Sequence, residues 1–274
     1  MPDESPHHGG GRRRGPLVEL DGVHVVFRSR TGSLLRAQRV HAVDDVSIQA
    51  HRGRTLGIVG ESGSGKTTMA KVLVGLQPAS SGTVRFRGEV VRRYTPRIRR
   101  RIGRVVSVVF QDPTTALNPR LRVADALRDP LDVHGVGTSA SRNARVRDLV
   151  RLVGLPASAL DALPGQLSGG QRQRVAIARA LALESDVIVA DEPTSALDVS
   201  VRAQILNLLA DLKAELNLGM VFISHDIQTV RHVSDDLVVM RGGRIVESGP
   251  AEQVLNRPAD DYTRTLLAAA PALL

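Results

Sequence analysis

Short apolar runs alternate along the chain with segments in which apolar residues recur at helical spacing. The continuous apolar runs lie at 56–59, 105–110, 187–190 and 220–223. Such runs are typical of parallel strands, because a parallel sheet is covered on both faces. Helical spacing of apolar residues marks 69–76, 175–182 and 201–216. The alternation predicts an α/β core built on a parallel sheet.

Shorter apolar stretches predict further strands outside this core. Residues 17–27 and 43–48 are expected to be strands joined by a polar loop at 28–40, and 82–91 is expected to be a hairpin. Together they predict an antiparallel sheet laid against the core. A last hairpin is expected at 237–247, and the basic stretch 92–104 is expected to be a solvated helix face.

The remaining segments set the domain organisation. Residues 1–16 are rich in Gly, Arg and His and predict a disordered tail, in which His7 and His8 are incidental. One main domain is expected at 17–250, with a helical subdomain inserted at about 112–168. We expect the inserted helices to be broken at Pro119, Pro130, Gly135, Gly137 and Pro156. Residues 251–274 are expected to form a C-terminal helical segment.

The run from Gly60 to Thr67 fits the phosphate-loop pattern G-x-x-x-x-G-K-[ST]. Glycines let successive backbone N–H groups turn inward and form an anion site. Lys66 is then expected to reach the β- and γ-phosphates, and the Thr67 hydroxyl to hold Mg²⁺. A Gly/Ser-rich surface turn would match by chance, but a strand before the loop and a helix after it favour the phosphate site.

Polar residues follow three other predicted strands of the core. Asp191 and Glu192 end one strand, and an adjacent carboxylate pair there suits Mg²⁺ binding and water activation, the alternative being a salt-bridged strand end. Gln111 and His225 end two more. Because α/β sheets bind ligands at the carboxyl ends of their strands, sharing that edge favours a catalytic His225 over a structural one.

Two further features each allow two interpretations. A predicted helix begins at Ser168, Gly169 and Gly170. These residues form either a second anion site or an ordinary N-cap with a flexible turn. Phe27 is one of only four Phe and is either packed in the core or exposed to stack on a base.

The amino-acid composition excludes several kinds of functional site. The 274 residues contain 42% hydrophobic residues, 2% aromatic residues and no Cys, so disulfides, thiolate zinc sites and cysteine nucleophiles are excluded. The net charge is +9, and Arg supplies nearly all of the basic residues. This charge suits nucleic acid or an anionic membrane, but its even dispersal favours solvated faces. No apolar run is long enough to span a bilayer.

With these motifs in this order, the chain resembles the ATP-binding subunits of ABC transporters over about residues 17–270. Leu167–Gln171 reads LSGGQ, the signature motif of that family, and lies between the helical insertion and the acidic strand. Segments 110–119, 191–200 and 262–267 resemble the branch that imports oligopeptides, dipeptides or nickel. Asp260 and Asp261 stand where that branch has His–Pro. The resemblance implies a P-loop NTPase (RecA-like) core with an N-terminal antiparallel β-subdomain and an inserted α-helical subdomain.

The resemblance also implies roles for individual residues. The residues expected to bind ATP are Phe27, Gly60, Glu61, Ser62, Gly63, Ser64, Gly65, Lys66, Thr67 and Thr68. Those expected to contact the ATP of a partner subunit are Leu167, Ser168, Gly169, Gly170 and Gln171, and Ser195 and Asp198 match the D-loop. Glu192 is implied as the general base, with His225 and Gln111 as further catalytic residues. Thr67, Gln111 and Asp191 are implied around Mg²⁺.

The implied activity is ATP hydrolysis that powers an importer, above all of di- or oligopeptides, with ATP and Mg²⁺ as cofactors. The implied partners are two membrane permease subunits, a second ABC ATPase (a paralogue or a second copy) and, indirectly, an extracytoplasmic solute-binding protein. The chain is expected to lie peripherally at the cytoplasmic face of the cell membrane and to bind no nucleic acid.

Several alternatives stay open from the sequence. The same kind of ATPase subunit could power the uptake of nickel or another small solute, and the ATPase motifs alone fit an exporter as well. A DNA- or ribosome-associated ABC ATPase gains some support from the +9 charge, although such proteins usually carry two cassettes or cysteine-bound zinc. A small-molecule kinase with a phosphate loop leaves Leu167–Gln171 and the acidic pair unexplained.

Overall fold

The computed structural model of the chain describes residues 15–29, 38–112 and 117–269. Most of the predicted tail 1–16 lies outside the described residues. So do the middle of the predicted loop 28–40, part of the segment 110–119 and the last residues of 251–274.

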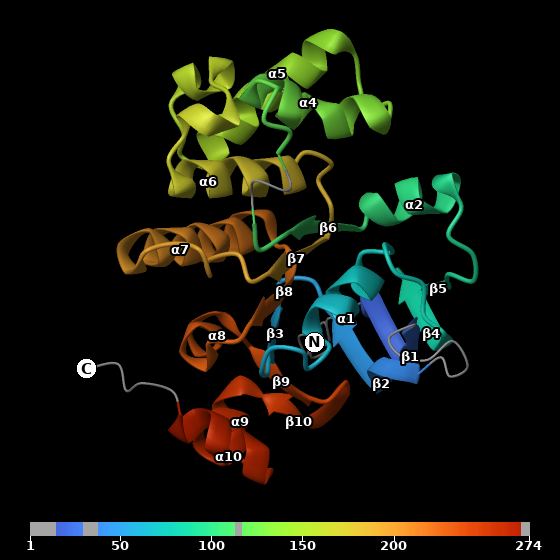
Figure 1. The fold of residues 1–274 in the computed structure, drawn as a ribbon. Helices are drawn as coiled ribbons and strands as arrows, with labels where there is room; N and C mark the ends of the chain where they lie inside the picture. The colour runs from blue at the N-terminus through green and yellow to red at the C-terminus, as the bar shows by residue number, and fades with distance from the viewer. Residues whose placement is uncertain (1–14, 30–37, 113–116, 270–274) are drawn as a thin grey trace, which may run out of the picture.

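A six-stranded sheet forms the centre of the molecule (Figure 1). Its strands are β3 (Thr55–Val59), β6 (Val106–Val109), β7 (Val187–Asp191), β8 (Gly219–Ser224), β9 (Asp236–Arg241) and β10 (Arg244–Pro250). They lie in the order β10-β9-β3-β8-β7-β6, and all neighbours are parallel except the edge pair β9 and β10. The apolar runs therefore do form parallel strands, and the predicted last hairpin forms the antiparallel edge.

A four-stranded antiparallel sheet lies against one face of this core. Its strands are β1 (Val18–Ser29), β2 (Gln38–Ala50), β4 (Ser81–Phe86) and β5 (Glu89–Val90), in the order β2-β1-β4-β5. The prediction of a loop over 28–40 was too wide, because β1 and β2 continue to pair through Ser29 and Gln38. Pairing with a neighbouring strand holds these polar residues in extended conformation, which their own sequence pattern does not indicate.

Helices cover both ends of the molecule and the faces of the central sheet. They are α1 (Lys66–Leu73), α2 (Pro96–Gly103), α4 (Val123–Val133), α5 (Ser139–Leu152), α6 (Gly169–Ala180), α7 (Val199–Leu216), α8 (Ile227–Val233), α9 (Ala251–Asn256) and α10 (Asp261–Ala268). Figure 1 shows α4, α5 and α6 at one end and α9 and α10 at the other. Helix α6 packs on α4, α5 and α7, so it joins the helical end to the sheet.

One predicted break in the helical region was wrong. Pro130 lies inside α4, which continues to Val133. Pro130 removes one backbone donor, but Ala126, Leu127 and Leu131 of the same helix are almost fully buried. The apolar face of α4 packs against α5 and α6, and this tertiary packing outweighs the local cost of the proline.

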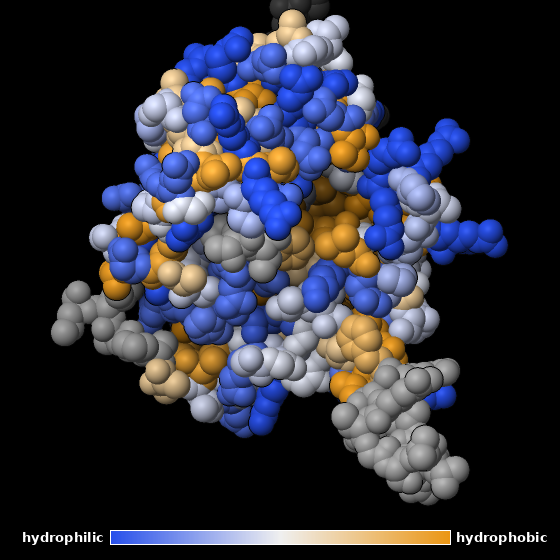
Figure 2. All heavy atoms as spheres, turned by 45° about the horizontal axis from the view of Figure 1, so that its top comes forward, coloured by the Kyte–Doolittle hydropathy of each residue, from blue (hydrophilic) through white to orange (hydrophobic). Residues whose placement is uncertain are grey.

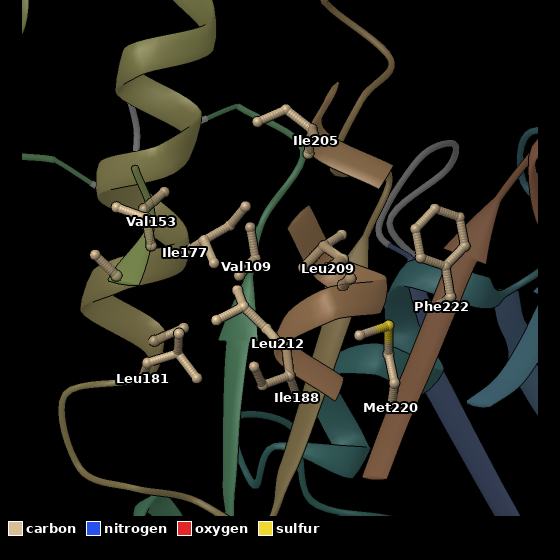
Figure 3. Close-up of a cluster of buried hydrophobic side chains, with 14 of the residues drawn as sticks. Val109, Val153, Ile177, Leu181, Ile188, Ile205, Leu209, Leu212, Met220 and Phe222 are labelled. Atoms are coloured by element: carbon tan, nitrogen blue, oxygen red, sulfur yellow. The ribbon is translucent and has the colours of Figure 1, made fainter. Parts of the chain in front are cut away.

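Side chains on the two faces of the central sheet enter different apolar clusters. Along β7, Val187 and Val189 pack with the antiparallel sheet and α1, whereas Ile188 and Ala190 pack with α6 and α7. Figure 3 shows this second cluster, to which Ile177 of α6, Leu209 of α7 and Ile188 of β7 belong. Burial of this kind contributes roughly 1.5–3 kcal/mol for each large side chain. It fixes the strand ends that carry the polar residues discussed below.

A buried ion-pair cluster at the start of β7 gives a first prediction. The Asp186 carboxylate accepts hydrogen bonds from the guanidinium groups of Arg52 and Arg87, and its side chain is 8% exposed. We expect Asp186→Asn to lower the free energy of unfolding by about 2 kcal/mol. The cost stays below that of a fully buried pair because both arginines keep contact with water. Asp161→Asn is the matched control, since the Asp161 side chain is 84% exposed. Urea denaturation would measure the free energy of unfolding of both variants. An equal loss in Asp186→Asn and Asp161→Asn would contradict the prediction.

Candidate active site

Four neighbouring parallel strands bring the predicted catalytic residues to one edge of the sheet. Gly60 follows β3, His225 follows β8, Glu192 follows β7, and Gln111 comes after β6. Of these, Gln111, Glu192 and His225 line one cleft of about 740 Å³ together with the phosphate loop. The other lining residues are Val40, His41, Ala42, Glu61, Ser62, Gly63, Gly65, Lys66, Thr67, Thr68 and Leu266. The structure thus brings these predicted site residues together.

The phosphate loop is held against neighbouring backbone. Gly65 has φ +101°, and a Cβ atom there would lie 2.2 Å from the Ala42 carbonyl oxygen, so only glycine fits. The Ser64 carbonyl accepts a hydrogen bond from the Gly243 N–H at 3.0 Å, which ties the loop to the turn between β9 and β10. Gly65 precedes α1, so the loop opens a helix as predicted, and the helix N-terminus favours bound anions.

Lys66 is buried and bonded to its own loop. Its Nζ donates to the carbonyl oxygens of Gly60 at 2.6 Å and Glu61 at 2.8 Å. Burial lowers the pKa of Lys66, and the nearby carboxylates of Glu192, Asp191 and Glu61 oppose that shift. A phosphate group would replace these carbonyl contacts with charge-assisted ones.

Asp191 is the buried carboxylate of the site, with 3% of its surface exposed. Its pKa is raised to about 6, first by burial and then by the charge of Glu192, while a hydrogen bond from Thr67 opposes the shift. Its Oδ1 is buried and has no hydrogen-bond partner. A carboxylate oxygen and a hydroxyl side by side are the ligands that Mg²⁺ prefers, so Asp191 and Thr67 fit that ion. Among the described residues there is no cluster of three or more His, Cys, Asp or Glu that could hold a metal ion.

Glu192 and His225 form a pair at the cleft. The Nδ1 atom of His225 lies 3.2 Å from Oε2 of Glu192. The backbone of Glu192 has φ +49°, in the left-handed region that few non-glycine residues adopt. Its N–H donates to the Ile223 carbonyl at 2.8 Å, and its own carbonyl accepts from Ser195 Oγ at 3.2 Å. Strained backbone of this kind is found at functional sites where neighbours enforce it.

The signature residues Leu167–Gln171 are not among the residues that line this cleft. Ser168 caps α6: its Oγ accepts from the Gln171 N–H at 3.2 Å, and Gln171 Oε1 accepts from the Ser168 N–H at 2.9 Å. A Cβ atom on Gly170 would lie 2.6 Å from Val201 Cγ1 of α7, so the start of α6 is packed closely on α7. The N-cap interpretation therefore holds, and the anion site at this helix N-terminus stays a prediction.

The two predicted D-loop residues both have local hydrogen-bond partners. Asp198 caps α7, since its Oδ1 accepts from the Val201 N–H at 2.9 Å and from Ser200 Oγ at 2.8 Å. The bond from Val201, followed by that from Ser200, lowers the pKa of Asp198. Ser195 bonds to the carbonyl of Glu192, as described above. Both residues therefore fix the chain that leads away from the acidic pair.

Phe27 lies beside the cleft but does not line it. It is 42% exposed and stands opposite Val40 in the pairing of β1 with β2. Val40 itself is a cleft residue. Of its two interpretations, exposure fits the base-stacking one and not packing in the core.

The sequence did not indicate two parts of the cleft, residues 40–42 of β2 and Leu266 of α10. It also did not indicate the Tyr262 hydroxyl, which does not line the cleft but accepts a hydrogen bond from the Glu61 N–H at 3.1 Å. Each comes from a segment distant in sequence from the phosphate loop, so no local pattern could place it there.

Comparison with known proteins decides the family. A family model described as ABC transporter matches residues 43–195. The chain belongs to the ABC transporter family. Among curated relatives, the dipeptide transport ATP-binding protein DppF of Haemophilus influenzae is 42% identical, covering 94% of this chain and 79% of the relative. The oligopeptide transport ATP-binding protein OppF of Lactococcus lactis is 41% identical, covering 94% of this chain and 81% of the relative.

A solved structure agrees with this assignment. The ATP-binding cassette MJ0796, in a dimeric post-hydrolysis state bound to ADP and phosphate, has a TM-score of 0.75 at 28% identity. The match covers 85% of this chain and 98% of that cassette. The predicted α/β fold of the P-loop NTPase type and the predicted class, an ATP-hydrolysing enzyme, are confirmed.

Proposed function

We propose that this chain is the ATP-hydrolysing subunit of an importer of di- or oligopeptides. The observation that carries the proposal is the 41–42% identity with ATP-binding proteins of dipeptide and oligopeptide transport, which extends over 94% of the chain. The match reaches well beyond the nucleotide core. The proposed location is the cytoplasmic face of the cell membrane, and among the described residues no helix has the length and apolar character needed to cross a bilayer.

The residues of the cleft suggest how hydrolysis proceeds. Glu192 accepts the proton of the attacking water, and His225, 3.2 Å away, contacts the transferred γ-phosphate. Lys66 stabilises the charge that develops on the phosphate oxygens. Mg²⁺ held by Asp191 and Thr67, with Gln111 nearby, would neutralise part of the phosphate charge. The orphaned Oδ1 of Asp191 supports this assignment.

The proposed working unit is a pair of ATPase subunits. Each ATP lies between the phosphate loop of one subunit and the Leu167–Gln171 segment of the other. Support comes from the position of that segment, which is absent from the lining of its own cleft. The second subunit is either a paralogue or a second copy of this chain. Closing and opening of the pair would drive the membrane subunits.

A groove beside the helical end is the proposed docking site of a permease subunit. It has a volume of about 470 Å³ and is lined by residues of β6, of α6 and of the end of α4, where Asp129, Pro130, Val133 and the C-cap His134 face it. Figure 2, which turns the helical end forward, shows a hollow with a hydrophobic floor there. Val133 in this groove is 60% exposed, so it offers an apolar side chain that a docked helix could cover.

Uptake by cells that carry this chain as their only copy would test the proposal. Labelled dipeptides, longer oligopeptides and nickel are offered to cells with Glu192→Gln or Val133→Arg. We expect both variants to lose peptide uptake, with Val133→Arg still binding ATP. The control for the groove is Leu76→Arg, because Leu76 is 49% exposed outside it. Loss of nickel uptake alone would reassign the cargo, and full peptide uptake by Glu192→Gln would refute the importer.

A further inference from the structure

The peptide bond between Gly60 and Glu61 is hydrogen-bonded on both of its sides. Its carbonyl oxygen accepts from Lys66 Nζ at 2.6 Å, while its N–H donates to the Tyr262 hydroxyl at 3.1 Å. One peptide plane therefore connects Lys66 with a tyrosine that lies 201 positions beyond Glu61 in the chain. The orientation of this plane decides where the first turn of the loop points.

Tyr262 is itself held firmly. It is 7% exposed, and the guanidinium of Arg241 lies 4.8 Å from the centroid of its ring. Its helix α10 begins with an N-cap, in which Asp260 Oδ1 accepts from the Tyr262 N–H at 2.8 Å. The Glu247 carboxylate of β10 accepts from the N–H groups of Ala259 and Asp260. These contacts tie the start of α10 to the central sheet.

The same helix forms part of the nucleotide cleft. Leu266 stands one turn beyond Tyr262 in α10 and lines the cleft together with Glu61 and Lys66. Helix α10 thus contacts the phosphate loop through a hydrogen bond and faces the cleft through an apolar side chain. An element that served only to close the end of the core would need neither contact.

We propose that Tyr262 is a positioning residue for the phosphate loop, so that the C-terminal helix α10 preorganises the chain to bind ATP. The inference rests on the proposed function, because ATP must be the nucleotide of this cleft. Without the hydroxyl, the Gly60–Glu61 peptide is free to rotate, and ATP binding must then order it at a cost in conformational entropy. A loop that is ordered before ATP binds avoids this entropic cost. We therefore expect the hydroxyl to affect the affinity for ATP and not the turnover number.

Tyr262→Phe in the full chain tests this assignment, because it keeps the ring and its contact with Arg241. We expect the dissociation constant for ATP to rise about fivefold, the scale of one lost hydrogen bond. The turnover number at saturating ATP should stay within about twofold of the wild type. Hydrogen exchange of the Glu61 amide should become faster, because its acceptor is gone.

The second tyrosine of the chain is a matched control. Tyr94 is partly buried beside Gly75, and its hydroxyl has no hydrogen-bond partner. Tyr94→Phe makes the same chemical change away from the cleft and should leave ATP affinity unchanged. Arg241→Gln is a second test that leaves the hydroxyl in place, and by loosening the ring it should weaken ATP binding about twofold.

The outcomes separate this inference from the proposed function. Unchanged ATP affinity in Tyr262→Phe, or an equal loss in Tyr94→Phe, would overturn the positioning role. A lower melting temperature without a change in affinity would also overturn it, because that is the mark of a structural residue only. A wild-type chain that bound no ATP would instead defeat the proposed ATPase itself.

Discussion

Replacing Glu192 by glutamine is expected to slow ATP hydrolysis by about a hundredfold or more, while ATP binding is retained. Glutamine has the shape of glutamate but cannot accept the proton of the attacking water. It also tolerates the left-handed backbone at φ +49° as well as glutamate does. Phosphate release measured at saturating ATP would give the rate, and a fluorescent ATP analogue would report binding.

The chain offers a close control for this variant. Glu184 also has a left-handed backbone, with φ +53°, and its side chain is 75% exposed near the helical end. Glu184→Gln therefore makes the same change in the same backbone conformation away from the cleft, and should hydrolyse ATP at the normal rate. Normal turnover by Glu192→Gln would remove Glu192 from the role of general base. Loss of ATP binding would show instead that the loop after β7 had been disturbed.

Lys66→Met is expected to abolish ATP binding at millimolar concentration and to reduce hydrolysis by about a hundredfold or more. Methionine keeps the apolar stem of the buried lysine and removes the ammonium that phosphate oxygens need. We expect a modest cost to the fold, about 1 kcal/mol, because the carbonyl oxygens of Gly60 and Glu61 lose the ammonium that donates to them.

Thermal unfolding with and without ATP separates the two effects. ATP should raise the melting temperature of the wild type, since a ligand stabilises the state that binds it. In Lys66→Met that increase should vanish, while the variant without ATP still unfolds in a single cooperative transition. Lys71→Met is the control, because Lys71 is an exposed residue of the same helix α1. An ATP-induced increase that survived in Lys66→Met would contradict the role of Lys66.

The sequence predicted those parts of the site that depend on local patterns. The phosphate loop has a fixed spacing, and Glu192 and His225 follow apolar runs that had to be buried strands. Since parallel strands end at one edge, their meeting in one cleft could be foreseen. The extension of β1 to Ser29, the helix that continues through Pro130 and the contact of Tyr262 with Glu61 could not. Each depends on which distant segment packs alongside, and no local sequence pattern carries that information.

The position of Leu167–Gln171 outside the cleft of its own chain has a consequence for protein dosage. If ATP is held between two copies of this chain, turnover follows the number of pairs and not the number of chains. Below the dissociation constant of the pair, mass action makes that number vary with the square of concentration, so half the protein gives about a quarter of the pairs. A cell that makes less of this subunit would then lose transport faster than it loses protein.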